Sequence, residues 1–131
     1  MVTTYTASVK SVEGKQWQSE ANTQKVTVSP PKEFGGEANT ASPEHLYALS
    51  LLNCYIATVK VIARKSNYDL GELSATIHVD LDTSKETPLS NAHIILKPEK
   101  NTKKFKHVMR KAKEHCYVHQ SVHTDITITC E

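Results

Sequence analysis

The chain has 131 residues, with 16 Lys and Arg against 14 Asp and Glu, for a net charge of +2. Its length predicts one domain over residues 1–131, and 38% hydrophobic with 23% charged residues excludes compositional disorder. The balanced charge argues against a nucleic-acid partner, which usually requires a concentrated basic surface. No stretch approaches the roughly 18 apolar residues of a membrane span, and the N-terminus lacks the apolar core of a signal peptide. We therefore expect a cytoplasmic protein with neither a nucleic-acid nor a membrane partner.

The first 28 residues predict an antiparallel meander of strands over residues 2–9, 16–21 and 24–28. These segments are rich in β-branched residues, which favour strands. Glu13-Gly14-Lys15 is typical of a hairpin turn, because glycine adopts the positive φ that tight hairpins need.

A loop is predicted to follow the meander. Pro30 and Pro31 end the sheet, because proline cannot donate a hydrogen bond to a ladder. Residues 32–41 include Phe34-Gly35-Gly36 followed by small and polar residues. Loops of this kind often carry functional residues.

A long helix is predicted from Ser42 to Lys65. Ser42 caps the free amides, Pro43 suits the first turn, and Glu44 suits the positive end of the helix dipole. From residue 46 to residue 58 the helix carries no charge and is apolar nearly all round. One small subunit can hardly cover such a helix, so we expect it at the centre of a homodimer.

The second half of the chain predicts two strands, a helix and a final strand. Residues 73–82 alternate between apolar and polar side chains, as in a half-buried strand, and residues 92–97 form another short strand. Residues 103–116 have apolar side chains at helical spacing, and residues 122–130 alternate again. The predicted fold is α+β, in the order β-β-β-α-β-β-α-β.

Three cysteines are candidates for chemistry: Cys54, Cys116 and Cys130. An odd number does not make a closed disulfide framework, and each could be a small buried apolar residue. Cys54 lies in the most apolar helix, where burial disfavours the thiolate, so a reactive Cys54 needs a nearby cation. Cys116 ends a helix rich in Lys and Arg. Cys130 is next to the C-terminus, and we interpret it as incidental.

Three histidines around Cys116 suggest a metal site, but their spacing argues against one. His115, His119 and His123 would share a face only in a continuous helix, and the β-branched residues after Val118 favour a strand. In that strand His119 and His123 would lie about 13 Å apart, too far to share an ion directly.

The motif Ser42-Pro43-Glu44-His45-Leu46, followed by Leu52-Asn53-Cys54 and a lysine-rich helix that ends in Cys116, resembles the OsmC/Ohr family. This family comprises osmotically inducible proteins and organic hydroperoxide resistance proteins. Phe34-Gly35-Gly36 and the order of elements agree with it, and the resemblance covers nearly the whole chain. It implies an OsmC-like fold and an intertwined homodimer with two active sites at the interface.

The resemblance also implies a function, that of a cysteine-based peroxidase for organic hydroperoxides in stress defence. Cys54 matches the family's peroxidatic cysteine and Cys116 its resolving cysteine, while Glu44 matches the glutamate that holds an activating arginine. No cofactor or metal is implied. The expected reductant is a dithiol, which the resemblance suggests is carried by a lipoylated protein.

The sequence departs from the family at that arginine, which normally precedes the Pro-Glu motif. The chain has only Arg64 and Arg110. We interpret Lys32 as its replacement, with Lys25 behind it, although a lysine cannot form the bidentate pair that arginine makes with a carboxylate.

Helix geometry limits how Glu44 and Cys54 can share a site. Within one helix they would lie about 15 Å apart along the axis and about 80° apart around it. Both can serve one site only if Glu44 reaches Cys54 of a second subunit, or if the first turn bends away.

Apolar residues expected near Cys54 predict a hydrophobic peroxide as the substrate. The predicted pocket residues are Phe34, Leu49, Leu52 and Ile56. Two other functions stay open: a dimer that binds a small apolar ligand without chemistry, with Cys54 in the core, and a thiol redox sensor.

Overall fold

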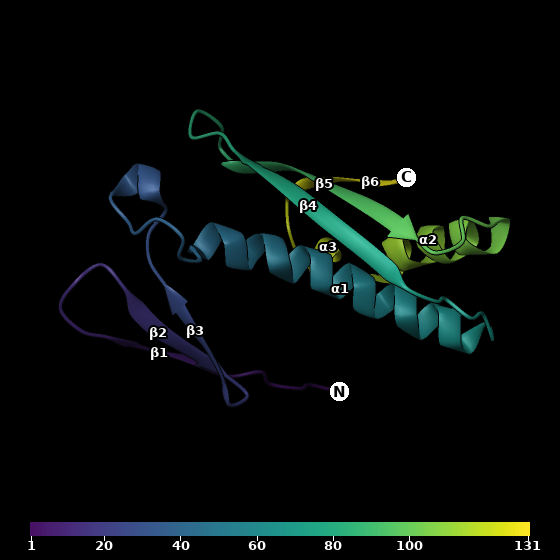
Figure 1. Cartoon of the computed structure of the whole chain (residues 1–131), viewed down its shortest axis with the longest axis horizontal. Coiled ribbons are helices and arrows are strands. Elements are labelled where there is room, and N and C mark those ends of the chain that lie inside the picture. The colour runs from purple at the N-terminus through teal and green to yellow at the C-terminus, as the bar shows by residue number, and fades with distance from the viewer. The chain divides into compact units, whose positions relative to one another are not determined.

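The computed structural model describes residues 1–131, which form two compact units, Met1–Tyr47 and Ala48–Glu131. Figure 1 shows the elements, and their order confirms the predicted α+β class. They are β1 (Ala7–Ser11), β2 (Trp17–Ala21), β3 (Gln24–Val28), the 3-10 helix η1 (Lys32–Phe34), α1 (Pro43–Lys65), β4 (Leu73–Leu81), β5 (Leu89–Pro98), α2 (Lys103–His115), α3 (Tyr117–Gln120) and β6 (Asp125–Cys130).

The first unit contains the predicted meander, an antiparallel sheet in the order β1-β2-β3. Its first strand begins at Ala7 rather than at residue 2, because Ala7 pairs with Ala21, the last residue of β2. Residues before Ala7 therefore have no partner along β2. Asn22 and Thr23 both have positive φ, which suits the tight turn between β2 and β3.

The predicted loop after β3 contains one short helical turn. The amide of Phe34 donates to the Pro31 carbonyl at 2.9 Å, and Gly35 ends the turn at a φ of 89°. Gly36 lies so close to the Pro30 carbonyl that a Cβ would collide with it. These two glycines are needed for different reasons, one for its backbone angle and the other for its lack of a side chain.

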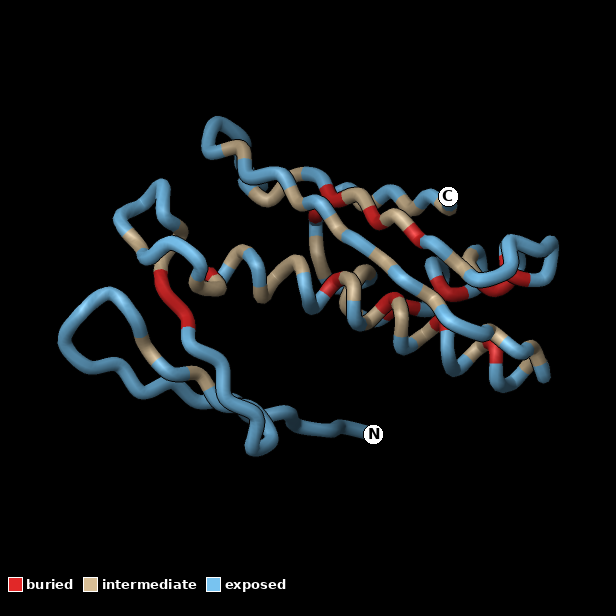
Figure 2. Tube along the Cα trace, viewed as in Figure 1, coloured by how far each residue is buried: buried red, intermediate tan, exposed pale blue.

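Little of the meander is covered within one chain. Val28 is its one buried residue, whereas Val9 and Val26 are exposed. In Figure 2 β1 is exposed throughout. A sheet of this size needs a packed hydrophobic face to be stable.

Helix α1 begins as predicted. The Ser42 hydroxyl accepts a hydrogen bond from the His45 amide at 3.2 Å and lies 2.7 Å from His45 Nδ1. One stripe of the helix is buried, comprising Leu51, Tyr55, Val59 and Ala63. The single chain thus covers one face only, and burial on the remaining faces stays a prediction for an assembled form.

The apolar character of α1 corrects the expectation that no stretch of the chain is long and apolar enough for a membrane span. This 23-residue helix is long and apolar enough to cross a membrane, by length and composition alone. One such helix is weak evidence for a membrane span, because the core helix of a soluble protein passes the same test.

The second unit packs two helices on one face of a sheet in the order β4-β5-β6. Strand β5 pairs antiparallel with β4 and parallel with β6, so that Ile77, Ile94 and Ile128 form a row across the sheet. The alternation predicted for β4 is confirmed by its burial pattern. Buried residues of the core are Tyr55, Val59 and Ala63 from α1, Ile94 and Leu96 from β5, and Phe105, Val108 and Ala112 from α2.

The segment after Cys116 is helical, which corrects the strand expected to begin near Val118. The amide of Gln120 donates to the Cys116 carbonyl at 3.1 Å and that of Ser121 to the Val118 carbonyl at 3.0 Å, so α3 is one short turn. Strand β6 then begins at Asp125, opposite Asn91. Because β6 runs parallel to β5, the chain needs a crossover connection, and α2 and α3 provide it.

We predict that Phe105→Ala lowers the free energy of unfolding by about 3–5 kcal/mol, because it removes a large, fully buried side chain from the core. Urea denaturation followed by circular dichroism measures the loss. Lys104→Ala, an exposed neighbour in the same turn, is the control, and its effect should stay within about 0.5 kcal/mol. A loss for Phe105→Ala no larger than that of the control would contradict the packing described.

Candidate functional site

Two cysteines that are 62 residues apart in the chain meet where α1 passes the end of α2. The thiol of Cys116 donates to Cys54 Sγ, with the two sulfur atoms 2.7 Å apart. Both cysteines are free thiols. A disulfide requires a separation of about 2.05 Å, so a small movement joins the two sulfur atoms.

The core of the second unit determines this meeting. On α1, Cys54 precedes buried Tyr55, and on α2 buried Ala112 lies one turn before Cys116. Because residues one turn apart share a face of a helix, the stripe that buries Ala112 also turns Cys116 inward.

Cys116 is fully buried. Burial and the hydrogen bond to Cys54 raise the pKa of the Cys116 thiol to about 11, against smaller opposing effects from the His119 and Val118 backbone amides. At neutral pH Cys116 is therefore a thiol, with a proton to share with Cys54.

His119 holds the turn that follows Cys116. Its Nε2 donates to the Leu51 carbonyl at 2.9 Å, and its ring stacks on Tyr55 with centroids 5.9 Å apart. The Tyr55 hydroxyl in turn donates to the Met109 carbonyl at 3.0 Å, and burial raises the pKa of Tyr55. His119 thus links α3 to α1, a role missed when the segment was interpreted as a strand.

Cys54 opens on a cavity of about 670 Å³ between α1 and α2. Cys116 does not line it, so a ligand in the cavity meets only one of the two thiols. The other lining residues are Ala57, Thr58, Val61, Ile62, Lys65, Ser66, His107, Lys111, His115 and Tyr117. The wall on α1 is largely apolar, α2 contributes basic side chains, and no carboxylate lines the cavity.

The predicted pocket residues lie elsewhere in the single chain. Leu52 and Ile56 pack partly buried against the core of the second unit, and Leu49 is exposed. Phe34 is exposed on η1. None of the four lines the cavity at Cys54, so their contact with substrate stays a prediction.

Glu44 and Lys32 do not form an ion pair in the single chain. The only ion pair is between Lys97 and Glu131, at 3.9 Å. Lys32 is exposed at the start of η1, whereas Glu44 Oε1 is buried with no hydrogen-bond partner. Helix α1 is continuous from Pro43 to Lys65, so no break bends Glu44 away from the axis that carries Cys54.

Cys130 belongs to β6 and lies opposite Leu96 of β5. It packs partly buried against the core, and burial raises the pKa of its thiol. This packing gives Cys130 a structural role. The structure contains no group of three or more Cys, His, Asp or Glu placed to hold one metal ion.

Comparison with known proteins supports the resemblance seen in the sequence. Residues 35–131 match the protein family described as OsmC-like protein. No match was found among functionally curated proteins.

Several solved structures share the fold. An organic hydroperoxide resistance protein OsmC from Legionella pneumophila is 20% identical with a TM-score of 0.82, over 100% of this chain and 98% of that one. An organic hydroperoxide resistance protein from Elizabethkingia anophelis is 17% identical with a TM-score of 0.80, over 100% and 97%. A putative osmotic stress induced and detoxification response protein from Psychrobacter arcticus is 19% identical with a TM-score of 0.82, over 99% and 96%.

We predict that mild oxidation links Cys54 to Cys116 and leaves Cys130 free, because only the first two sulfur atoms lie within reach of each other. The measurement is peptide mapping after one equivalent of an organic hydroperoxide or a dithiol oxidant, with remaining thiols blocked by alkylation. Cys130→Ser should give the same linked peptide. A disulfide that includes Cys130 would contradict the assignment.

Proposed function

The chain belongs to the OsmC-like protein family, and on this premise we propose that it is a thiol peroxidase that reduces organic hydroperoxides. The observation that carries the proposal is the pair of thiols 2.7 Å apart, of which Cys54 alone lines a cavity. A peroxidatic cysteine must be accessible to substrate, and a resolving cysteine must lie next to it. Cys54 meets the first requirement and Cys116 the second.

The proposed reaction begins at Cys54. Its thiolate attacks the distal oxygen of the hydroperoxide, the O–O bond breaks, and the departing alkoxide takes a proton and leaves as the alcohol. Cys54 becomes a sulfenic acid. Cys116 then attacks that sulfur as it loses its proton, and a Cys54–Cys116 disulfide forms with release of water.

The cycle closes when a dithiol reductant opens the disulfide by exchange. On the basis of the family resemblance, we propose that a lipoylated protein supplies this dithiol and that the reaction takes place in the cytoplasm.

The cavity favours an organic peroxide over hydrogen peroxide. Ala57, Val61 and Ile62 offer an apolar wall to an alkyl or aryl group. A volume of about 670 Å³ also lies within the range of small-molecule sites, which is about 300–1,000 Å³. The same cavity would suit a ligand binder that performs no chemistry, and loss of peroxide separates the two functions.

A homodimer is part of the proposal. Leu49 and Val61 on α1 are exposed, and so are Val9 and Val26 of the sheet β1-β2-β3. A second copy would bury both surfaces. It would also bring Glu44 of one subunit toward Cys54 of the other, which one continuous helix cannot do.

The sequence offers Lys32, held by Glu44, as one candidate for the cation beside Cys54. The buried, unpartnered Oε1 of Glu44 supports this pairing, because a buried carboxylate oxygen favours a positive partner. Lys32 has no such partner in the single chain, so this pairing requires the assembled form.

We predict that Cys54→Ser abolishes reduction of a bulky organic hydroperoxide, because the serine hydroxyl is not a comparable nucleophile. Cys116→Ser should permit one turnover and leave Cys54 as sulfenic or more oxidised acid. Cys130→Ser should retain full activity. Peroxide consumption with thiol counting and mass spectrometry measures all three. Equal activity of Cys54→Ser and the unmodified protein would refute the peroxidase proposal.

We predict a stable dimer at micromolar protein concentration, with a buried interface of about 2,000 Å² or more. Sedimentation velocity gives the assembly state directly. Val61→Glu, which places a charge on an exposed apolar position of α1, should weaken the dimer, and Lys60→Glu is the neighbouring control. A monomer across the concentration range would remove the dimer and the contribution of Glu44 from a second subunit.

A further inference from the structure

The basic side chains that line the Cys54 cavity carry an inference that rests on the proposed function. Lys65, His107, Lys111 and His115 all line it, and no carboxylate does. On α2 the basic residues are at positions 107, 111 and 115, each one turn after the last. They form a basic stripe beside the buried stripe of Val108 and Ala112.

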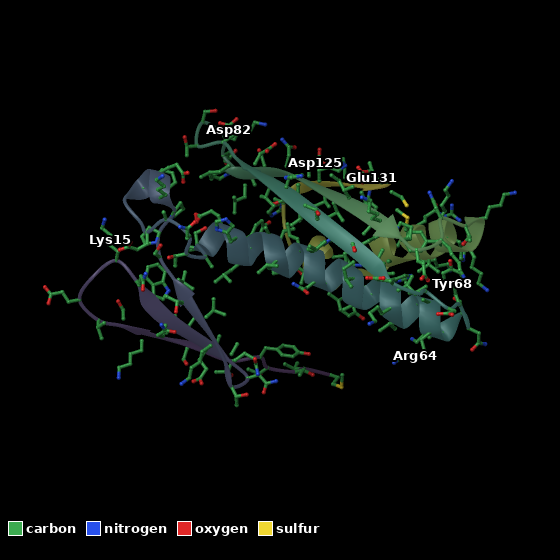
Figure 3. The ribbon with its side chains drawn as sticks, viewed as in Figure 1. Lys15, Arg64, Tyr68, Asp82, Asp125 and Glu131 are labelled. Atoms are coloured by element: carbon green, nitrogen blue, oxygen red, sulfur yellow. The ribbon has the colours of Figure 1, made fainter.

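The relative direction of the two helices decides which of these groups lie near Cys54. The contact of Cys54 with Cys116 brings the middle of α1 to the C-terminal end of α2. At the other end, the Tyr68 hydroxyl lies 2.9 Å from Thr102 Oγ1, which brings the segment after α1 to the start of α2. The helices therefore run antiparallel. Figure 3 labels Arg64 in the last turn of α1 and Tyr68 in the segment that follows it.

Lys65 and His107 lie at the far end of the cavity. Lys65 is about 16 Å from Cys54 along α1. His107 is further engaged by Arg110, whose Nη2 donates to His107 Nδ1 at 3.1 Å. Neither is placed to stabilise a thiolate on Cys54.

Lys111 and His115 lie at the near end. His115 immediately precedes Cys116, and Lys111 is about 7.5 Å before Cys116 along the axis of α2. The ammonium of a lysine is carried by a flexible four-carbon side chain, which allows it to reach along the wall of the cavity. Lys111 has no carboxylate within ion-pair distance, so no side chain of the chain neutralises its charge.

We propose that Lys111, with His115 beside it, supplies the positive charge that stabilises the Cys54 thiolate from within the same chain. Lys111 thereby supplies the charge that the sequence predicts for Lys32. This arrangement needs neither Lys32 nor a second subunit to activate the thiol.

The test is a thiolate titration of Cys54 in a protein that retains no other cysteine. The double substitution Cys116→Ser, Cys130→Ser leaves Cys54 as the single thiol and keeps a hydroxyl donor at position 116. Ultraviolet absorbance of the thiolate, or the rate of iodoacetamide alkylation, is followed against pH. Adding Lys111→Met should lower the thiolate fraction at neutral pH by about tenfold, a midpoint shift of about one unit.

Two control variants sharpen the test. Lys113→Met also removes a charge from α2, but Lys113 lines a different cavity, the one beside Cys130. The midpoint of the Cys54 titration should therefore not move. Lys111→Arg keeps the charge and should keep the midpoint. If Lys111→Met does not fold, Lys111→Gln takes its place, because position 111 is exposed and tolerates a polar side chain.

An unchanged midpoint in folded Lys111→Met would overturn the inference, as would a shift produced by Lys32→Met instead. The outcome is separate from the proposed peroxidase activity. A midpoint that moves with Lys111 in a protein that consumes no peroxide would leave this inference standing and refute the function. Peroxide reduction by a protein whose Cys54 midpoint does not move in Lys111→Met would support the proposed function and overturn this inference.

Discussion

The contact between Cys54 and Cys116 is the feature on which the rest of the site depends, and it is a product of core packing. Tyr55 and Ala112 are fully buried in the same core, and each lies next to, or one turn from, one of the cysteines. A change that rotates either helix would separate the two sulfur atoms while leaving both thiols intact. His119 adds a second restraint, because its ring stacks on Tyr55 and its Nε2 donates to the Leu51 carbonyl.

The two chemically identical side chains differ in their exposure. Cys54 is part of a cavity wall, whereas Cys116 is fully buried behind it. Burial favours the neutral thiol at Cys116, which can then donate a hydrogen bond to its neighbour. Position therefore gives the two thiols different surroundings without any difference in residue type.

Much of the fold could be predicted from local signals. The Ser42 cap, the alternation of β4 and the helical spacing of α2 each depend on neighbouring residues, and the structure agrees with all of them. The helix α3 was missed because a single turn has no apolar periodicity. It forms because the Gln120 amide donates to the Cys116 carbonyl and because His119 contacts α1, a tertiary effect.

The site was harder to predict than the fold. Cys54 and Cys116 were identified through the family resemblance, and their proximity depends on helix packing that no local pattern contains. The cavity lining follows from the antiparallel direction of α1 and α2, so the basic residues of α2 could not be assigned to Cys54 from their sequence positions. Leu52 and Ile56 were expected in the pocket because they are apolar, but apolar side chains on α1 also pack against the core.

In the proposed reaction, the spacing of the two sulfur atoms also sets the order of the steps. A charge on Cys54 raises the pKa of Cys116, because two thiolates 2.7 Å apart would repel each other. The pair therefore holds one negative charge in preference to two, and of the two cysteines only Cys54 lines the cavity that contains the basic side chains. Once Cys54 is oxidised to a neutral sulfenic acid, that repulsion disappears, and Cys116 can give up its proton as it attacks. In this proposal the first step removes the electrostatic barrier to the second, and Cys116 reacts only after Cys54 has been oxidised.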